Sequence, residues 1–325
     1  MKNKIVKAMI FISELVSSLM AFGWSFFSIT IRARRKKNKY QKERKFQLRH
    51  LKINHPKDKF RTLYEDGKAW SMEQPKKDCY ITSKDGLLLH AAYLPAQNAK
   101  RILILCHGYR GTAYGDFANI AKYLHEHNCS LLFVDERCCG ESEGEYITFG
   151  AMEQWDIQRW AYYVARRNKK NLPIYLYGMS MGAASVLMAS GHDLPPDVKG
   201  LIADCGFSSM EKQMRDMAKN WYHLKWIELE MLSMKMSCEL FGGFHMKDAD
   251  VTEALKKNRR PVLFFHGGRD TFVDPKNSKR NYAMCCAPKE LVIVPTARHL
   301  CSSYEQPELY RKKLMNFFNK TESLS

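Results

Sequence analysis

A serine between two glycines marks the segment of this chain best suited to covalent chemistry. Gly178–Gly182 reads Gly-Met-Ser-Met-Gly, follows the apolar run 174–177 and leads into a helix-forming stretch from Ala183. A strand, a Gly-x-Ser-x-Gly turn and a helix form a nucleophile elbow, in which glycines allow a sharp turn that exposes the serine hydroxyl. The turn also places the amide of Met181 at a helix N-terminus, where negative charge is stabilised. We therefore predict that Ser180 is a nucleophile.

A second Gly-x-Ser-x-Gly match, centred on Ser142, lacks this context. The preceding apolar strand ends at Val134, several residues too early, and no helix-forming stretch begins at Gly144. Glutamates on both sides of Ser142 also disfavour a nearby negative charge. We interpret Ser142 as a loop residue.

A nucleophilic serine needs a general base and an acid that orients the base. Among the eleven histidines, His299 has the best context, because it follows the last strand-like run and precedes a helical stretch. Asp270 follows the preceding strand in a Gly-Gly-Arg-Asp turn, and Asp204 ends another strand as the alternative acid. We favour a triad of Ser180, Asp270 and His299, in that chain order.

The negative oxygen that forms during acyl transfer needs two amide donors. Besides the amide of Met181, we predict that of Tyr109, which follows the His-Gly pair after the strand 102–106. His107 and His266, each in a His-Gly pair, are interpreted as structural residues.

From about Lys77 to Phe318 the chain resembles the α/β-hydrolase superfamily, in particular its serine aminopeptidase-like branch and bacterial membrane-anchored members of unassigned substrate. The motifs that carry this resemblance are His107–Tyr109, Asp135–Gly144, Gly178–Gly182, Asp204–Phe207, His266–Asp270 and His299. Cys138 and Cys139 depart from the usual pattern of the second motif. The resemblance implies the α/β-hydrolase fold with the Ser, Asp, His order, but it does not specify a substrate, because this fold carries many functions.

Apolar runs that alternate with helical stretches predict a mostly parallel eight-stranded sheet with helices on both faces. The expected strands are 79–82, 87–94, 102–106, 131–134, 174–177, 201–203, 262–266 and 291–294. After the sixth strand, a helical cap insertion is expected at 207–258. It is rich in methionine and aromatic residues, which either line an acyl pocket or pack the cap onto the core.

The ten cysteines show neither Cys-x-x-Cys nor zinc-like spacing, so we expect free thiols, a reducing compartment and no metal or cofactor. The net charge of +18 is concentrated in residues 1–61, which carry a net +14. This distribution argues against nucleic-acid binding by the catalytic domain.

Residues 8–31 carry a single charge, Glu14, and ten lysines and arginines lie in 32–49. We predict a membrane anchor helix within 1–31, a basic juxtamembrane linker at 32–76 and the hydrolase domain at 77–325. The basic cluster favours a cytoplasmic catalytic domain at the cell membrane. The alternative is an interfacial helix on anionic lipid.

These features together predict a serine hydrolase that cleaves an ester or thioester with an apolar acyl group. An amidase or aminopeptidase is the alternative enzyme, and a non-catalytic binding scaffold is disfavoured because no triad residue is missing. We expect a small-molecule acyl substrate, association with the membrane and no obligate protein partner. The fragment 77–325 contains every predicted catalytic residue and is therefore expected to be active alone.

Overall fold

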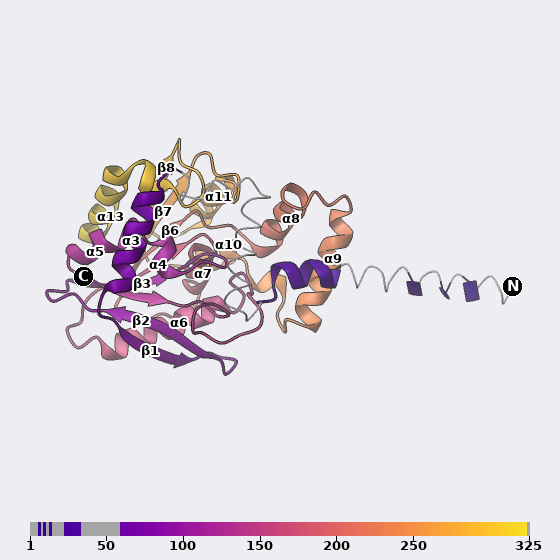
Figure 1. The fold of residues 1–325 in the computed structure, drawn as a ribbon, viewed down its shortest axis with the longest axis horizontal. Coiled ribbons are helices and arrows are strands. Elements are labelled where there is room, and N and C mark those ends of the chain that lie inside the picture. The colour runs from indigo at the N-terminus through magenta and orange to yellow at the C-terminus, as the bar shows by residue number, and fades with distance from the viewer. Residues whose placement is uncertain (1–5, 8, 11–12, 15–22, 34–58, 324–325) are drawn as a thin grey trace.

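The computed structural model describes residues 6–7, 9–10, 13–14, 23–33 and 59–323. An eight-stranded sheet forms its centre, in the order β1-β2-β4-β3-β5-β6-β7-β8 (Figure 1). The strands are β1 Lys77–Thr82, β2 Leu88–Leu94, β3 Arg101–Cys106, β4 Cys129–Val134, β5 Ile174–Met179, β6 Val198–Asp204, β7 Val262–Gly267 and β8 Lys289–Val294. Strand β2 is antiparallel to β1 and β4, and the other neighbours are parallel. The predicted eight-stranded, mostly parallel sheet is confirmed.

The central strands are apolar along their whole length because helices cover both faces of the sheet. In β3, Ile102 and Ile104 join one core with α6 and α7, whereas Leu103 and Leu105 join a second core with α5 and α13. These helices are α5 Ala121–Glu126, α6 Glu153–Arg167, α7 Met181–Ala189 and α13 Pro307–Glu322. The remaining helices around the sheet are α4 Ala113–Asp116, α10 Val251–Lys257, α11 Lys276–Met284 and α12 Ser302–Glu305.

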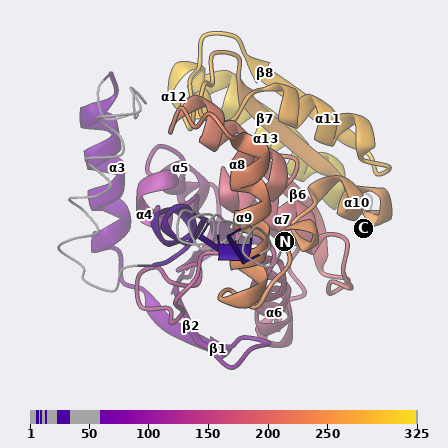
Figure 2. The same cartoon turned by 90° about the vertical axis from the view of Figure 1, so that its right-hand side faces the viewer.

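The cap consists of α8, Met210–Asn220, and α9, Ile227–Leu240, followed by the short 3-10 helix Met246–Asp248. Both helices project from one end of the molecule, and Figure 2 shows that end facing the viewer. The predicted insertion 207–258 also includes α10, but α10 packs beside α7, and its Val251 and Leu255 belong to the main core. The cap proper therefore ends before α10.

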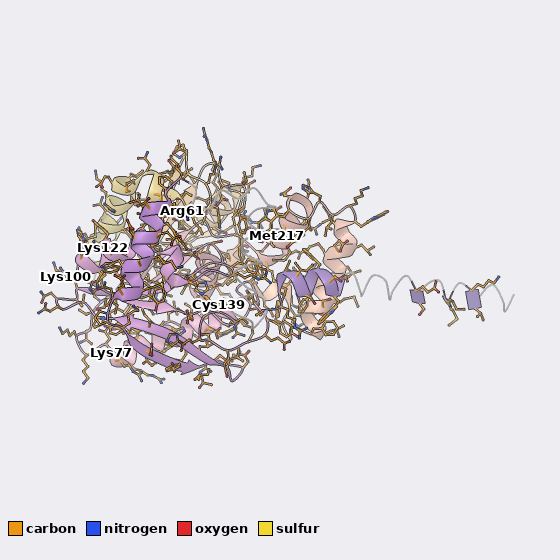
Figure 3. The ribbon with its side chains drawn as sticks, viewed as in Figure 1. Arg61, Lys77, Lys100, Lys122, Cys139 and Met217 are labelled. Carbon is orange, nitrogen blue, oxygen red and sulfur yellow. The ribbon has the colours of Figure 1, made fainter. Side chains whose placement is uncertain are left out.

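Most methionines of this insertion pack the cap onto the rest of the protein. The buried ones are Met210, Met214, Met217, Met231, Met234 and Met246, whereas Met236 is exposed. Met217, labelled in Figure 3, lies on α8 where the cap meets the sheet domain and lines the cavity at Ser180. The packing interpretation thus accounts for most of the cluster, and Met217 also contributes to the pocket.

The end of the predicted anchor helix packs against the rest of the protein. Residues 23–30 are helical, and Phe26, Phe27 and Ile31 are buried in the main core beside the cap. Over the described residues, no helix has both the length and the apolar character that crossing a bilayer requires. Much of the predicted anchor and the whole of 34–49 lie outside the described residues.

The predicted basic linker contains a helix, α3, at Arg61–Glu73. Gly67 packs tightly against the backbone at Ala118. A side-chain carbon on Gly67 would lie 1.9 Å from the Ala118 carbonyl oxygen. Tyr64 is buried in a small cluster with Ala118 and Tyr304. Residues before Lys77 are therefore part of the folded unit.

Candidate active site

The turn between β5 and α7 has the geometry of a nucleophile elbow. Ser180 adopts φ 54° and ψ −114°, a strained conformation for a residue with a side chain. A side-chain carbon on Gly178 would lie 2.3 Å from the Gly182 carbonyl oxygen, and one on Gly182 would lie 2.2 Å from that of Cys106. Only glycine fits at these two positions, which explains the spacing seen in the sequence.

The structure brings the three predicted triad residues together. The Oγ of Ser180 lies 2.9 Å from Nε2 of His299, and Nδ1 of His299 lies 2.7 Å from Oδ2 of Asp270. All three side chains are buried. Because an ionised carboxylate only accepts hydrogen bonds, Nδ1 carries the proton and Nε2 is free to accept the one from Ser180. This is the arrangement that general-base activation of a serine requires.

The loop after β7 holds Asp270 in its ionised form. Its Oδ1 accepts hydrogen bonds from the amides of Phe272 and Val273, at 2.8 and 2.9 Å. Burial opposes ionisation, but the neighbouring imidazoles of His299 and His266 outweigh it and hold the pKa of Asp270 well below its usual range. A permanently charged Asp270 is suited to stabilising an imidazolium at His299.

Two glycines bring the acid loop against the histidine loop. A side-chain carbon on Gly267 would lie 2.5 Å from the Ala297 carbonyl oxygen, and one on Gly268 would lie 2.8 Å from that of Pro295. The amide of Arg269 donates to the same Ala297 oxygen at 2.9 Å. The Gly-Gly-Arg-Asp sequence therefore sets the distance between Asp270 and His299.

Asp204, the alternative acid, is occupied elsewhere. Its Oδ2 accepts a hydrogen bond from the Tyr310 hydroxyl at 2.9 Å, and its Oδ1 lies 3.4 Å from the Ser302 hydroxyl. Burial raises the pKa of Asp204, and the Tyr310 hydrogen bond offsets only part of that effect. Geometry and charge both favour Asp270 as the acid.

The predicted oxyanion loop passes directly over Ser180. A side-chain carbon on Gly108 would lie 3.0 Å from Cβ of Ser180, and the Gly108 amide donates to Oδ2 of Asp116 at 2.7 Å. Tyr109 follows in this tight turn, and Met181 is the first residue of α7, where amides have no partner within the helix. The backbone amides of Tyr109 and Met181 remain our predicted oxyanion donors.

The N-terminal helix anchors this loop, a contact that the sequence did not predict. The Tyr109 hydroxyl donates to the Thr30 carbonyl oxygen at 2.6 Å, and Nη2 of Arg110 donates to that of Ile29 at 2.7 Å. Arg110 has a φ of 51°, so its backbone also needs support. The sequence signal for this contact was the pair of aromatic residues Phe26 and Phe27 near the end of the apolar run 8–31. Such residues pack against a bilayer as well as against a protein.

The other residues considered from the sequence have structural roles. The Ser142 hydroxyl donates to the Asp135 carbonyl oxygen at 2.6 Å and accepts from the His90 amide at 2.8 Å. Nε2 of His107 accepts from the Glu136 amide at 3.2 Å. His266 donates from Nε2 to the Val273 carbonyl oxygen at 2.8 Å. Ser142 and His107 thus brace loops, while His266 supports the Asp270 loop.

Cys205, Asp270 and His299 place possible metal-ligand atoms within 4.8 Å of one another. Burial raises the pKa of the Cys205 thiol well above its usual value, so this thiol keeps its proton and is a poor ligand. The other two residues already form the hydrogen-bonded chain to Ser180. Asp270 and His299 therefore remain our predicted acid and base, and Cys205 is interpreted as a buried free thiol.

A small apolar cavity reaches Ser180, with about 10 Å³ open to the centre of a water-sized sphere. It has room for about one water molecule, so a larger acyl group needs the residues around the cavity to move. Its lining residues are Tyr109, Phe149, Ser180, Met181, Phe207, Gln213, Met217, Trp221, Phe272 and Val273. None of these lining residues carries a charge at neutral pH.

The central part of the chain, residues 97–235, matches the family model described as serine aminopeptidase, S33. The uncharacterized protein YqkD of Bacillus subtilis is 25% identical over 254 residues, which cover 77% of this chain and 81% of that protein. The uncharacterized protein YfhR of Escherichia coli K12 is 25% identical over 255 residues, covering 76% of this chain and 81% of that protein.

Solved structures show the same fold. The Pyrococcus furiosus esterase Pf2001 has a TM-score of 0.63 at 20% identity, covering 77% of this chain and 93% of that one. Est1E from Butyrivibrio proteoclasticus, solved with ferulic acid bound, has a TM-score of 0.56 at 19% identity, covering 75% and 99%. With the sheet topology above, these likenesses show that the chain has the α/β-hydrolase fold and that its residues 97–235 are similar to the serine aminopeptidase S33 family.

Proposed function

We propose that this protein is a serine hydrolase that cleaves an ester or thioester with an apolar acyl group. The observation that carries the proposal is the hydrogen-bonded chain from Ser180 through His299 to Asp270, at 2.9 and 2.7 Å. A chain of this kind makes a serine hydroxyl nucleophilic at neutral pH.

The reaction proceeds in two halves. His299 takes the Ser180 proton as the hydroxyl oxygen attacks the acyl carbonyl, and the amides of Tyr109 and Met181 stabilise the negative oxygen that forms. His299 then gives its proton to the leaving group, while Asp270 stabilises the imidazolium. In the second half, His299 takes a proton from water as the water attacks the acyl-enzyme. His299 then returns a proton to the Ser180 oxygen, and the acid is released.

The cavity favours an uncharged, apolar acyl group. Phe149, Phe207, Met217 and Trp221 supply its apolar walls. Gln213 adds a side-chain amide to the cavity wall. The Oε1 atom of this amide is buried without a hydrogen-bond partner. That amide can hold one polar atom of a substrate that is otherwise apolar.

An aminopeptidase is the alternative, and the family description of residues 97–235 is the observation that favours it. An aminopeptidase must bind the ammonium group of its substrate, which when buried requires an anionic partner. Among the described residues lining the cavity, the polar side chains near Ser180 are uncharged. We therefore place the ester or thioester first.

A substrate panel tests this order directly. We expect kcat/KM on p-nitrophenyl esters to rise with acyl length until the cap can open no further, and to exceed that on aminoacyl anilides. One buried methylene is worth about 0.8 kcal/mol, or roughly fourfold per carbon at best. Faster turnover of the anilides would make the aminopeptidase assignment correct, and no turnover of either class would favour a binding scaffold.

The N-terminal helix should support activity even on a soluble ester. Removing residues 1–33 deletes the carbonyl oxygens that hold Tyr109 and Arg110 and the Phe26 ring, whose centroid lies 5.4 Å from that of Tyr222. We expect kcat/KM to fall about tenfold or more, because small displacements of catalytic groups are costly. The fragment 77–325, which the sequence predicts to be active alone, also lacks this helix and should have the same lowered kcat/KM.

The measurement compares kcat/KM with the thermal unfolding midpoint of the same truncated protein. Arg110→Ala in the full chain serves as a milder variant, since it removes one anchor and leaves the helix in place. Unchanged kcat/KM in both variants would show that the helix does not position the loop.

We also propose that the protein acts at the cell membrane with its catalytic domain in the cytoplasm. The support is in the sequence: the apolar run 8–31 and the ten basic residues that follow in 32–49. The burial of Phe27 and Ile31 by the protein favours the interfacial arrangement for the last turns of that run.

A further inference from the structure

The outer face of the cap helix α9 is apolar although it lies on the surface. The side chains that share this face, here called the α9 stripe, are Trp226, Leu229, Leu232, Met236, Leu240 and Phe241, and all six are exposed. Trp226 is 72%, Leu240 63% and Leu232 56% exposed. The first five are spaced three or four residues apart, which places them along one side of the helix, and Phe241 follows Leu240 at its C-terminal end.

The inner face of α9 is apolar as well. Met231, Met234 and Cys238 are buried in the main core. A helix that is apolar on both its inner and outer sides usually has a partner on each side, such as protein within and lipid without. A contiguous exposed apolar patch of this kind marks an interaction surface, whereas scattered single residues do not.

The α9 stripe continues into the N-terminal helix. The ring centroids of Trp24 and Phe241 are 4.4 Å apart, and Gly23 lies directly against Ser233 of α9. Ile29 on that helix is also exposed. Figures 1 and 2 show α9 and residues 23–30 side by side at the end of the molecule away from α3.

Of the charged residues of α9, Lys235 and Glu228 form ion pairs with charged partners, whereas Glu239 contacts a histidine. Lys235 lies 3.1 Å from Glu211, Glu228 is bonded to Arg215, and Glu239 lies 2.9 Å from His245. Glu230 is buried on the inner side. Glu228 and Glu239 therefore border the stripe near Leu232, and Arg215 offsets the charge of Glu228.

We propose that the α9 stripe rests on a phospholipid bilayer, next to the segment that enters or lies on it. The choice of lipid over a protein partner follows from the chain attached to this surface: an apolar run at 8–31 and ten basic residues in 32–49, which anionic headgroups attract. Lipid contact at α9 places the cap, which covers the cavity at Ser180, against the bilayer.

The test locates α9 relative to the bilayer in the full chain. Leu232→Cys is made with Cys286→Ser, because Cys286 is the exposed native cysteine, and is labelled with a dye whose emission shifts to the blue in apolar surroundings. The matched control is Leu63→Cys, which is 54% exposed on α3, the helix whose first residue, Arg61, is labelled in Figure 3 away from the cap. The vesicles contain phosphatidylcholine and phosphatidylglycerol, with and without spin-labelled lipid.

We expect vesicles to shift the emission of the dye at position 232 to the blue, and spin-labelled lipid to quench it, with neither effect at position 63. Adding Trp226→Glu and Leu240→Glu should weaken the lipid response at position 232 roughly tenfold or more, because two immersed apolar side chains are lost. The pair Leu63→Glu and Met72→Glu on α3 should leave that response unchanged. Turnover of a soluble ester checks that each variant is folded.

Three results would overturn the proposal. Emission typical of water at position 232 in the presence of vesicles would mean that lipid does not cover the stripe. A blue shift without vesicles that grows with protein concentration would identify a second copy as the partner. A blue shift without vesicles that is independent of concentration would mean that the chain covers its own stripe.

Discussion

Ser180→Ala should abolish turnover and labelling by a fluorophosphonate probe. Alanine removes the oxygen that lies 2.9 Å from Nε2 of His299, while the elbow keeps its flanking glycines. Without a nucleophile only the oxyanion donors and substrate binding remain, so we expect kcat to fall by about 10⁴-fold or more. Mass spectrometry of the labelled wild type should place the adduct on Ser180.

Ser142→Ala is the matched control, because it removes a second hydroxyl from the same five-residue pattern. That hydroxyl bonds to the backbone at Asp135 and His90 and supports the loop after β4. We expect a loss of about 1 kcal/mol in the free energy of unfolding with labelling retained. Labelling that survives Ser180→Ala and disappears in Ser142→Ala would transfer the role of nucleophile.

The sheet and the meeting of Ser180, Asp270 and His299 were predictable because both depend on short patterns in the sequence that allow one spatial arrangement. Apolar runs separated by helical stretches specify a parallel sheet, and the carboxyl ends of its strands meet at one edge. Ser180, Asp270 and His299 each follow such a strand, so their meeting is a consequence of topology. The glycines beside them report close approaches that a side-chain carbon would prevent.

The N-terminal segment was less predictable because an apolar residue does not specify its partner. Phe26, Phe27 and Ile31 fit a bilayer as well as a protein core, and the structure buries them in the core beside the cap. Their contacts with residues more than a hundred positions away leave no local pattern. Composition alone therefore assigned the whole run to the membrane.

The helix α3 was missed for a different reason. Its two fully buried residues are Tyr64 and Ser71, with Gly67 against Ala118 and Trp70 half-buried on the second core. These residues repeat at helical spacing, but Trp70 is the one large apolar side chain among them. Five of its thirteen residues are charged, and together with the basic run before them they gave the segment the character of a linker. Gly67, which touches the backbone at Ala118, was the one local signal of close packing.

Asp270→Asn should lower kcat far more than Asp204→Asn, by about 10³- to 10⁴-fold against less than about tenfold. An asparagine at 270 can present its amide hydrogens to Nδ1 of His299 and so favour the tautomer that cannot accept the Ser180 proton. It also removes the negative charge of Asp270, a carboxyl group whose pKa the site holds below its usual range. Both effects act on the reaction and leave the fold largely intact.

Asp204→Asn separates a structural acid from a catalytic one. Asp204 accepts hydrogen bonds from Tyr310 and Ser302 in the core, so an amide there leaves a mismatched donor and should cost about 1–3 kcal/mol of the free energy of unfolding. Its thermal midpoint should therefore fall while kcat per folded molecule stays close to that of the wild type. Measured together, the rate of fluorophosphonate labelling and the unfolding midpoint of each variant distinguish the two roles. If Asp204→Asn lost labelling while Asp270→Asn retained it, the acid of the triad would be Asp204, with His299 reorienting toward the end of β6.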